Sequence, residues 1–306
     1  MHPAFSVIFF TTMSGAGYGL WIWLGVMPLF GQSIPRTTAL IVLALGFVLT
    51  SLGLLSSTLH LGKPQRAWRA FSQWRSSWLS REGVLAMSCL LPAAWFAITT
   101  WQGRDARMAG MLLAALSLAT VACTAMIYVS LKPIPAWRHA VVLPVYLLFA
   151  LLTGGLAYAA VCAVSGRFID NDVASGVLFG CFFLWRAKHF YWRDLDHDAL
   201  PATRAAAVGL PPDRDVRVFE RPHTEANYLT KEMGFVLARK HSGRLRLMAL
   251  LLFALMPALC AIAMWLFAHH SASPWLVMAA LSALAGTFVE RWLFFAEARH
   301  VVTLYY

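Results

Sequence analysis

Eight long apolar segments dominate the 306-residue chain and restrict what it can fold into. A helix needs about 20 mostly apolar residues to cross the hydrocarbon core of a bilayer. The eight segments are residues 5–29, 38–59, 83–101, 108–129, 140–164, 173–191, 246–268 and 274–297. Charged residues make up only 13% of the chain, against roughly 25% in soluble domains. The sequence therefore predicts an all-α, polytopic membrane protein, a single eight-transmembrane-helix bundle over residues 1–306, and excludes a soluble enzyme.

The first apolar segment is predicted to remain in the protein as a membrane helix. A signal peptide has basic residues before a short apolar core, whereas this chain has no Lys or Arg before Arg36 and stays apolar as far as Phe30. Small residues let membrane helices approach closely. We therefore expect Gly15, Gly17 and Gly19 of this segment to pack against neighbouring helices.

Basic residues are distributed unevenly between the two ends of the predicted bundle. With eight spans, 21 of the 25 Lys and Arg residues fall on the side that holds both termini. Such an excess marks the cytoplasmic side of a membrane protein. We therefore expect a bacterial inner-membrane protein with cytoplasmic N- and C-termini. The same bias explains the net charge of +11, so membrane lipid is an expected partner and nucleic acid is not.

Two cytoplasmic connections are longer than turns. Between the second and third spans, Trp68, Phe71, Trp74 and Trp78 recur at helical spacing, which predicts a helix that lies in the membrane interface. Residues 192–245 form a long cytoplasmic loop of mixed charge between the sixth and seventh spans. Its composition is compatible with a docking surface for a soluble partner and equally with a flexible solvated loop.

Ionisable side chains at membrane depth are costly and are functional candidates by default. In this chain they gather near the cytoplasmic face: His60, Glu82, Arg186, Lys188, Glu290 and Arg291. A quinol site needs an apolar slot, a hydrogen-bonding group and a titratable group in reach of water. His60 and Glu82 bracket the Trp-rich segment and meet these needs.

Each of these residues also has a structural interpretation. His60 and Glu82 are compatible with helix ends that touch water, and Lys188 is expected to extend to the interface. Glu290 and Arg291 are compatible with a structural ion pair. A transporter is the alternative from another class, although transporters usually have two repeated halves and a site at the midplane. No internal repeat is visible in the sequence, and a purely structural scaffold is the third possibility.

The cysteines and histidines argue against a redox centre held by this chain. All five cysteines stand singly in apolar runs, without the paired spacing of zinc or iron–sulfur ligands. None of the ten histidines lies in the middle of a predicted helix, where a bis-histidine haem would need them. The sequence predicts no haem and no iron–sulfur cluster here, so if quinone chemistry occurs, its electrons must pass directly to a cluster in another subunit.

The stretch LHLGKPQRAWRAFSQWRSSWLSRE, residues 59–82, resembles the signature of the membrane anchor subunits of dimethyl sulfoxide reductase-type complexes. The opening HPAFSVIFFTTMSGAGYGL is similar to the start of such anchors. NYLTKEMGFVLARKHS in the long loop and ERWLFFAEARHVV near the end resemble the same family. The resemblance covers essentially the whole chain and implies eight spans.

This resemblance implies a three-chain complex for anaerobic respiratory electron transport. A molybdopterin catalytic subunit and a four-cluster iron–sulfur subunit are anchored by a haem-free protein that exchanges electrons with menaquinol or ubiquinol. The family's quinol-site residues match His60 and Glu82, and its last-helix arginine matches Arg291. We expect Arg66 or Arg81 to tune the charge of Glu82.

The resemblance also leaves alternatives open. The anchor alone is expected to have no activity toward the terminal substrate. The long loop is more similar to that of anchors of quinone-linked sulfite dehydrogenases, so a quinone-reducing complex of that type is the alternative function.

Overall fold

Helices are the regular elements of the computed structural model, which describes residues 4–32, 34–59, 63–167, 169–197, 200–211, 213–220, 225, 237–267 and 271–305. The elements of the first half are α1 (Phe5–Val26), η1 (Met27–Phe30), α2 (Arg36–Thr58), η2 (Pro64–Gln73), α3 (Trp78–Ser88), α4 (Leu90–Trp101) and α5 (Arg107–Val129). Those of the second half are α6 (Val142–Val164), α7 (Asn171–His197), α8 (Arg204–Ala207), α9 (Leu237–Leu250), η4 (Leu251–Leu255), α10 (Met256–Leu266), α11 (Ser273–Ala296) and η5 (Val301–Tyr305).

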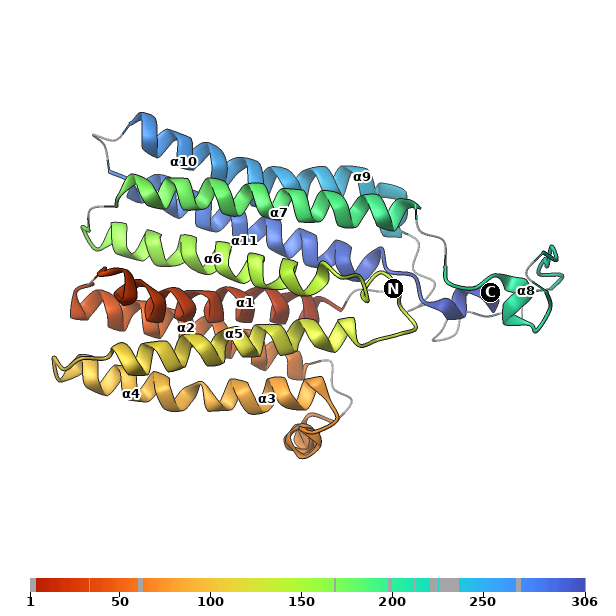
Figure 1. Ribbon diagram of the computed structural model, residues 1–306, viewed down its shortest axis with the longest axis horizontal. Coiled ribbons are helices and arrows are strands. Elements are labelled where there is room, and N and C mark those ends of the chain that lie inside the picture. The colour runs from red at the N-terminus through yellow and green to blue at the C-terminus, as the bar shows by residue number, and fades with distance from the viewer. Residues whose placement is uncertain are drawn as a thin grey trace.

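Seven stretches of the described chain are long and apolar enough to cross a membrane. Two of them are interrupted: α3 and α4 form one span with a break at Cys89, and α9, η4 and α10 form another. The 27-residue α7 lies alongside them in the bundle (Figure 1) and is the eighth long helix. Helix α7 is not among the seven apolar stretches because its second half carries Arg186, Lys188 and further charged residues. The predicted all-helical membrane fold is confirmed.

The helices extend beyond several of the predicted segments. The third span begins at Trp78 instead of residue 83, so Glu82 lies in its second turn. Helix α7 continues to His197, and α9 begins at Leu237. The connection between them is therefore shorter than the 192–245 predicted for the long loop, and it includes the one-turn helix α8.

The first four spans and the last four repeat one packing arrangement. In the first group, α1 packs on α2 and α5, α3 and α4 pack on α5, and α4 packs on α2. In the second group, α6 packs on α7 and α11, and α10 packs on α11 and α7. The two groups meet where α1 and α5 contact α6 and where α1 contacts α11 (Figure 1). A repeat that the sequence does not show is thus present in the structure.

Glycines allow the central helix α1 to approach its neighbours closely. A Cβ on Gly19 would overlap the Ala150 carbonyl oxygen of α6, and a Cβ on Gly17 would lie 2.9 Å from the Gly46 carbonyl oxygen of α2. The packing role predicted for these two glycines is confirmed. It is wrong for Gly15, where an added Cβ would meet no atom within 4 Å. Gly15 faces a cavity instead.

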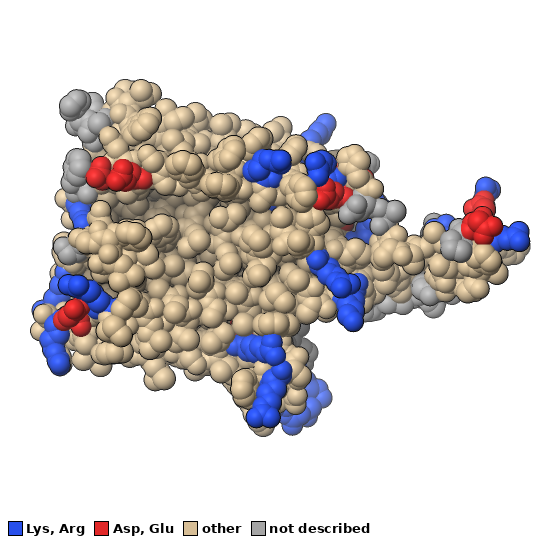
Figure 2. Space-filling model, viewed as in Figure 1, with Lys and Arg blue, Asp and Glu red and all other residues tan. Residues whose placement is uncertain are grey.

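The aromatic segment before the third span is a separate short helix. Trp68, Phe71 and Trp74 are exposed on and directly after the 3-10 helix η2, while Trp78 is the first residue of α3. The prediction of one continuous aromatic face over all four residues is therefore wrong, because the chain turns at residues 74–76. Figure 2 shows basic side chains gathered on this projecting helix.

The glycine contacts generate a prediction about stability. Gly19→Ala is expected to destabilise the protein by about 1–3 kcal/mol, because the added methyl group overlaps the α6 backbone and the two helices must separate. The measurement is the unfolding temperature in detergent. Gly15→Ala is the matched control on the same helix and is expected to leave that temperature unchanged or raise it. Equal effects of the two substitutions would contradict the close α1–α6 contact.

Candidate functional site

Glu82 is a buried acid near one end of the bundle. Helix α3 starts at Trp78, where the Ser77 side chain accepts a hydrogen bond from the Ser80 backbone N–H at 3.4 Å. Glu82 lies one turn after Trp78, and only 4% of its surface is exposed. It accepts a hydrogen bond from the Thr124 hydroxyl of α5. The interpretation of Glu82 as a residue at a helix end in contact with water is therefore wrong.

Two polar stripes run along otherwise apolar helices toward Glu82. On α1, Thr11, Ser14, Gly15 and Tyr18 follow the spacing of one helical face. On α5, the members are Ser117, Thr120 and Thr124. Such stripes are costly where a helix faces lipid. They are stable here because both are buried against other helices.

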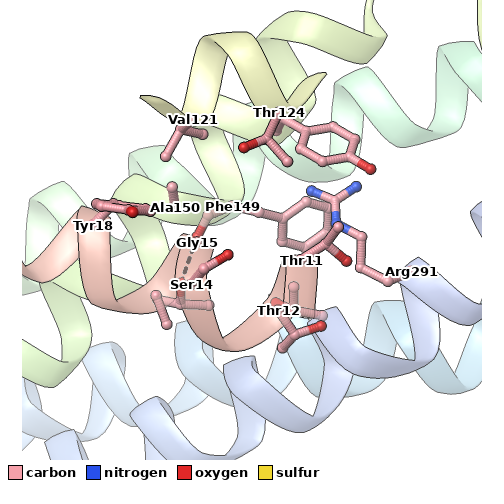
Figure 3. A pocket seen from close by; sticks show the side chains of 14 residues that line it. Thr11, Thr12, Ser14, Gly15, Tyr18, Val121, Thr124, Phe149, Ala150 and Arg291 are labelled. Carbon is pink, nitrogen blue, oxygen red and sulfur yellow. Dashed lines mark hydrogen bonds between the residues drawn. The ribbon is translucent and has the colours of Figure 1, made fainter. Parts of the chain in front are cut away.

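The α1 stripe and Thr124 of the α5 stripe line a polar cavity between the two halves of the protein. Side chains of α1, α5, α6 and α11 surround it (Figure 3). Thr124 contributes to its wall, so the residue that hydrogen-bonds Glu82 also faces the cavity. The cavity is narrow, with room for about one water molecule. A quinone ring is far larger and does not fit inside it.

Arg291 of α11 also lines this cavity. It is 2% exposed, and its guanidinium carbon lies 3.6 Å from the centre of the Tyr146 ring and 5.1 Å from that of Phe149. Its Nη1 is 3.2 Å from Glu290 Oε2. Cation–π contacts of this kind gain strength when water is excluded. The charge of Arg291 is thus held by two aromatic rings and one carboxylate.

Lys188 of α7 completes a buried ionic triad. Its Nζ donates a hydrogen bond of 2.6 Å to Glu290 Oε1 and lies 4.1 Å from the centre of the Tyr191 ring. Lys188 is 1% exposed and Glu290 is fully buried. The expectation that Lys188 extends to the interface is wrong, because α11 presents Glu290 to it inside the bundle. We call Lys188, Glu290 and Arg291 the ionic triad.

A second group of charges lies at the same end of the bundle. Arg246 of α9 donates hydrogen bonds of 2.6 and 2.9 Å to the Asp196 carboxylate and one of 2.8 Å to Glu297 Oε1. Burial raises the pKa of the Glu297 carboxyl above its usual range, and Arg246 opposes this shift. These side chains line a surface pocket together with His139 and Arg299. The group ties α7, α9 and α11 together at their ends.

The structure separates the predicted site residues into three sets. Arg291 lines the cavity, and Glu82 is linked to the same cavity through its hydrogen bond with Thr124. Arg66 is exposed on η2, and Arg81 donates hydrogen bonds to the backbone carbonyls of Trp74 and Arg75 at 3.0 and 2.7 Å. His60 lies outside the described residues. The roles of all five in a quinol site stay predictions.

Several residues of this region were not predicted from the sequence. Thr124, Tyr146 and the polar stripe of α1 were overlooked because threonine and tyrosine are common in membrane helices. Their signal was the spacing of three, four and seven residues between polar positions on one helical face. Sequence spacing alone could not pair Lys188 with Glu290, since these residues are 102 positions apart.

Cysteines form no disulfide in the described part of the chain. All five are free and buried, as their apolar surroundings predict. Within the described ranges, no three His, Cys, Asp or Glu side chains come together as ligands for a metal ion.

Comparisons with known proteins relate the whole chain to membrane anchors. A family model described as DMSO reductase anchor subunit (DmsC) matches residues 1–296. A sulfite dehydrogenase subunit of Allochromatium vinosum is 29% identical over 328 aligned positions, which cover all of this chain and 99% of that relative. Both matches run across every span, so they include the helices that build the cavity.

The ionic triad generates a prediction about charge balance. Lys188→Met is expected to destabilise the protein by about 3–5 kcal/mol, because it leaves the buried Glu290 without its closest cation. The double variant Lys188→Met/Glu290→Gln keeps the net charge of the triad and is expected to recover part of that loss. Unfolding temperatures of the two single variants and the double variant give the coupling.

The exposed pair Arg217–Asp215 provides the control. Arg217→Met is expected to leave the unfolding temperature unchanged, since exposed pairs contribute little. Additive effects of Lys188→Met and Glu290→Gln would contradict a coupled buried pair.

Proposed function

Because this chain belongs to the DMSO reductase anchor subunit family, we propose that it oxidises quinol at its basic end and passes the electrons to an iron–sulfur subunit. Membership of the family already makes the chain a multi-pass membrane protein and the membrane anchor of a molybdoenzyme complex, which pairs it with catalytic and electron-transfer subunits. The quinol, the direction of electron flow and the four-cluster composition of the partner are part of the proposal.

The observation that carries the proposal is the buried carboxyl group of Glu82. A quinol gives up two electrons and two protons on oxidation, so its site needs a proton acceptor. Glu82 lies in the second turn of α3, directly after the five Lys and Arg residues of positions 63–81, and Thr124 holds its carboxyl group in place. General bases of this kind typically contribute a factor of about 10²–10⁴ to a rate.

The quinol ring is proposed to reach Glu82 from the side of η2. The cavity behind Glu82 is too narrow for the ring. On the other side, Phe71 of η2 packs next to Gly83, where an added Cβ would lie 3.1 Å from the Phe71 ring. The exposed Trp68 and Trp74 of this segment offer aromatic surface to a ring that arrives from the lipid.

His60, Arg66 and Arg81 are proposed to act in the same quinol site as Glu82. His60 directly precedes this segment in the chain and is proposed to bind or deprotonate one quinol oxygen, with Glu82 accepting and relaying the proton. Arg66 and Arg81 are proposed to add positive charge at the mouth of the site. The two electrons then pass to the nearest iron–sulfur cluster of the partner subunit. No haem or cluster of this chain takes part in the proposal, and menaquinol or ubiquinol is the electron carrier.

The relative from Allochromatium vinosum favours a second candidate function, the reduction of quinone. It is described as part of a sulfite dehydrogenase, and its similarity to this chain spans both proteins. By analogy, the anchor would take electrons from its partner and reduce quinone, with Glu82 supplying a proton. The purified complex distinguishes the two candidates: sulfite-dependent quinone reduction supports the second, and quinol-dependent reduction of an S-oxide or N-oxide supports the first.

The role of Glu82 is tested by a substitution that retains its hydrogen bond. The amide of Glu82→Gln still accepts from Thr124 but no longer takes up a proton, so the complex is expected to assemble while turnover falls at least about 100-fold. Turnover of the purified complex with a quinol analogue is the measurement. Glu82→Asp is expected to restore part of the rate, and His60→Ala is expected to lower it as Glu82→Gln does.

Asp215→Asn serves as the control, since Asp215 is an exposed acid of the long connection. It removes a carboxylate without touching the site and is expected to leave turnover unchanged. Normal turnover of Glu82→Gln in an intact complex would overturn the assignment of Glu82.

The proposed orientation is tested with reporter fusions. The 21 basic residues on the side of the termini support a cytoplasmic location for that side. A fluorescent protein at the C-terminus is therefore expected to fluoresce. Alkaline phosphatase inserted between α4 and α5 is expected to be active, since it would be exported. The reverse pattern would contradict the proposed cytoplasmic location of the quinol site.

A further inference from the structure

Four polar side chains that line the cavity between the two halves have atoms without a hydrogen-bond partner among the described residues. They are Thr12 Oγ1, the hydroxyl groups of Tyr18 and Tyr146, and Nε and Nη1 of Arg291. All four residues are at most 3% exposed. A buried polar atom that stays unsatisfied costs free energy, and buried water usually supplies the missing bond.

The cavity has the size and chemistry of a water site. It has room for about one water molecule, and hydroxyl and guanidinium groups face it from α1, α6 and α11 (Figure 3). A buried water molecule typically makes about three hydrogen bonds. The unpartnered atoms supply both donors and acceptors for them. An apolar ligand would leave the same atoms unsatisfied.

The buried charges of this region indicate what the water connects. The ionic triad contains two cations, Lys188 and Arg291, and one anion, Glu290. It therefore carries one excess positive charge inside the bundle. On the Lys188 side, the group of Arg246, Asp196 and Glu297 supplies one excess negative charge. On the Arg291 side, Glu82 is the buried acid whose hydrogen-bond partner Thr124 lines the same cavity as Arg291, and its ionised form supplies a negative charge there. In a medium of low dielectric constant, such balance is strongly favoured.

We propose that the cavity binds water that joins the Thr124–Glu82 pair to Arg291, so that Arg291 acts on Glu82 as its counter-charge through that water. Arg291 is then a positioning residue that does not touch the quinol. Its guanidinium remains charged at every accessible pH and holds the water with Nε, while Nη1 lies against Glu290 Oε2. Tyr146 and Phe149 cover the guanidinium and keep it from turning away.

The inference deepens the proposed function of Glu82, yet it can be tested without quinol. Infrared difference spectra of the purified full-length chain in lipid report the protonation state of buried carboxyl groups. The band of Glu82 is identified by its loss in Glu82→Gln. In the wild type at neutral pH, we expect the carboxylate form. In Arg291→Gln, a protonated carboxyl band is expected to appear, and it is expected to vanish in Arg291→Gln/Glu82→Gln.

Two further variants control for the change of charge. Arg291→Lys keeps the counter-charge and is expected to keep Glu82 ionised. Arg107→Gln removes an exposed arginine at the other end of the bundle and is expected to have no effect on the Glu82 band. The counter-charge role is overturned if Arg291→Gln leaves Glu82 ionised, or if Arg107→Gln changes the band equally.

A second pair of variants tests the water itself without altering any charge. Thr12→Val removes an unpartnered hydroxyl group, whereas Thr153→Val removes one that lines the same cavity but already donates to the Phe149 carbonyl at 2.7 Å. Exchange of water for its oxygen-18 form is expected to shift an O–H band of the enclosed water in the wild type. We expect Thr12→Val to lose this shifted band and Thr153→Val to retain it.

These outcomes separate the inference from the function on which it rests. Normal quinol turnover in Glu82→Gln, together with the expected infrared changes, would remove the proposed function and leave the water site in place. A wild type without any isotope-sensitive band of enclosed water would overturn the water site, whatever the turnover of Glu82→Gln.

Discussion

Burial of charge in a low-dielectric interior is the constraint on which this structure depends. Lys188, Glu290 and Arg291 are all almost fully enclosed, and none of them would be tolerated alone at that depth. Each is stabilised by another charge or by an aromatic ring. Because the partners come from α6, α7 and α11, the charges also determine how the second group of helices packs. A change in the charge of one of these residues is therefore expected to change the packing of α6, α7 and α11 as well.

The two halves of the protein contribute different chemistry to their junction. The first half supplies the carboxyl group of Glu82 and the hydroxyl groups of α1 and α5, and the second half supplies the ionic triad. The close contact at Gly19 brings α1 against α6 and holds these two sets in a fixed relation. The cavity lies between these two sets of polar residues, where helices of the two halves do not pack closely.

Much of the fold could be predicted from the sequence, because apolar length is a direct requirement of the bilayer. That requirement predicts the eight long helices. It also singles out Glu82 and Arg291 as ionisable side chains within membrane helices. The prediction for Lys188 is wrong because a lysine near a helix end can either extend to water or pair inside the bundle. Which of the two occurs depends on the face of α11 that lies opposite. Thr124 was missed because its importance arises only from its contact with Glu82. Such pairings belong to the tertiary structure and have no local signature.

The repeated arrangement of the halves has one more consequence. Thr124 and Glu290 each lie 17 positions after the first residue of their helices, Arg107 of α5 and Ser273 of α11. Both helices start at the same end of the bundle (Figure 1), so the two side chains lie at nearly the same depth, about 26 Å along at 1.5 Å per residue. A shift of charge between Glu82 and the triad therefore runs parallel to the bilayer plane. Such a shift does almost no work against the transmembrane voltage.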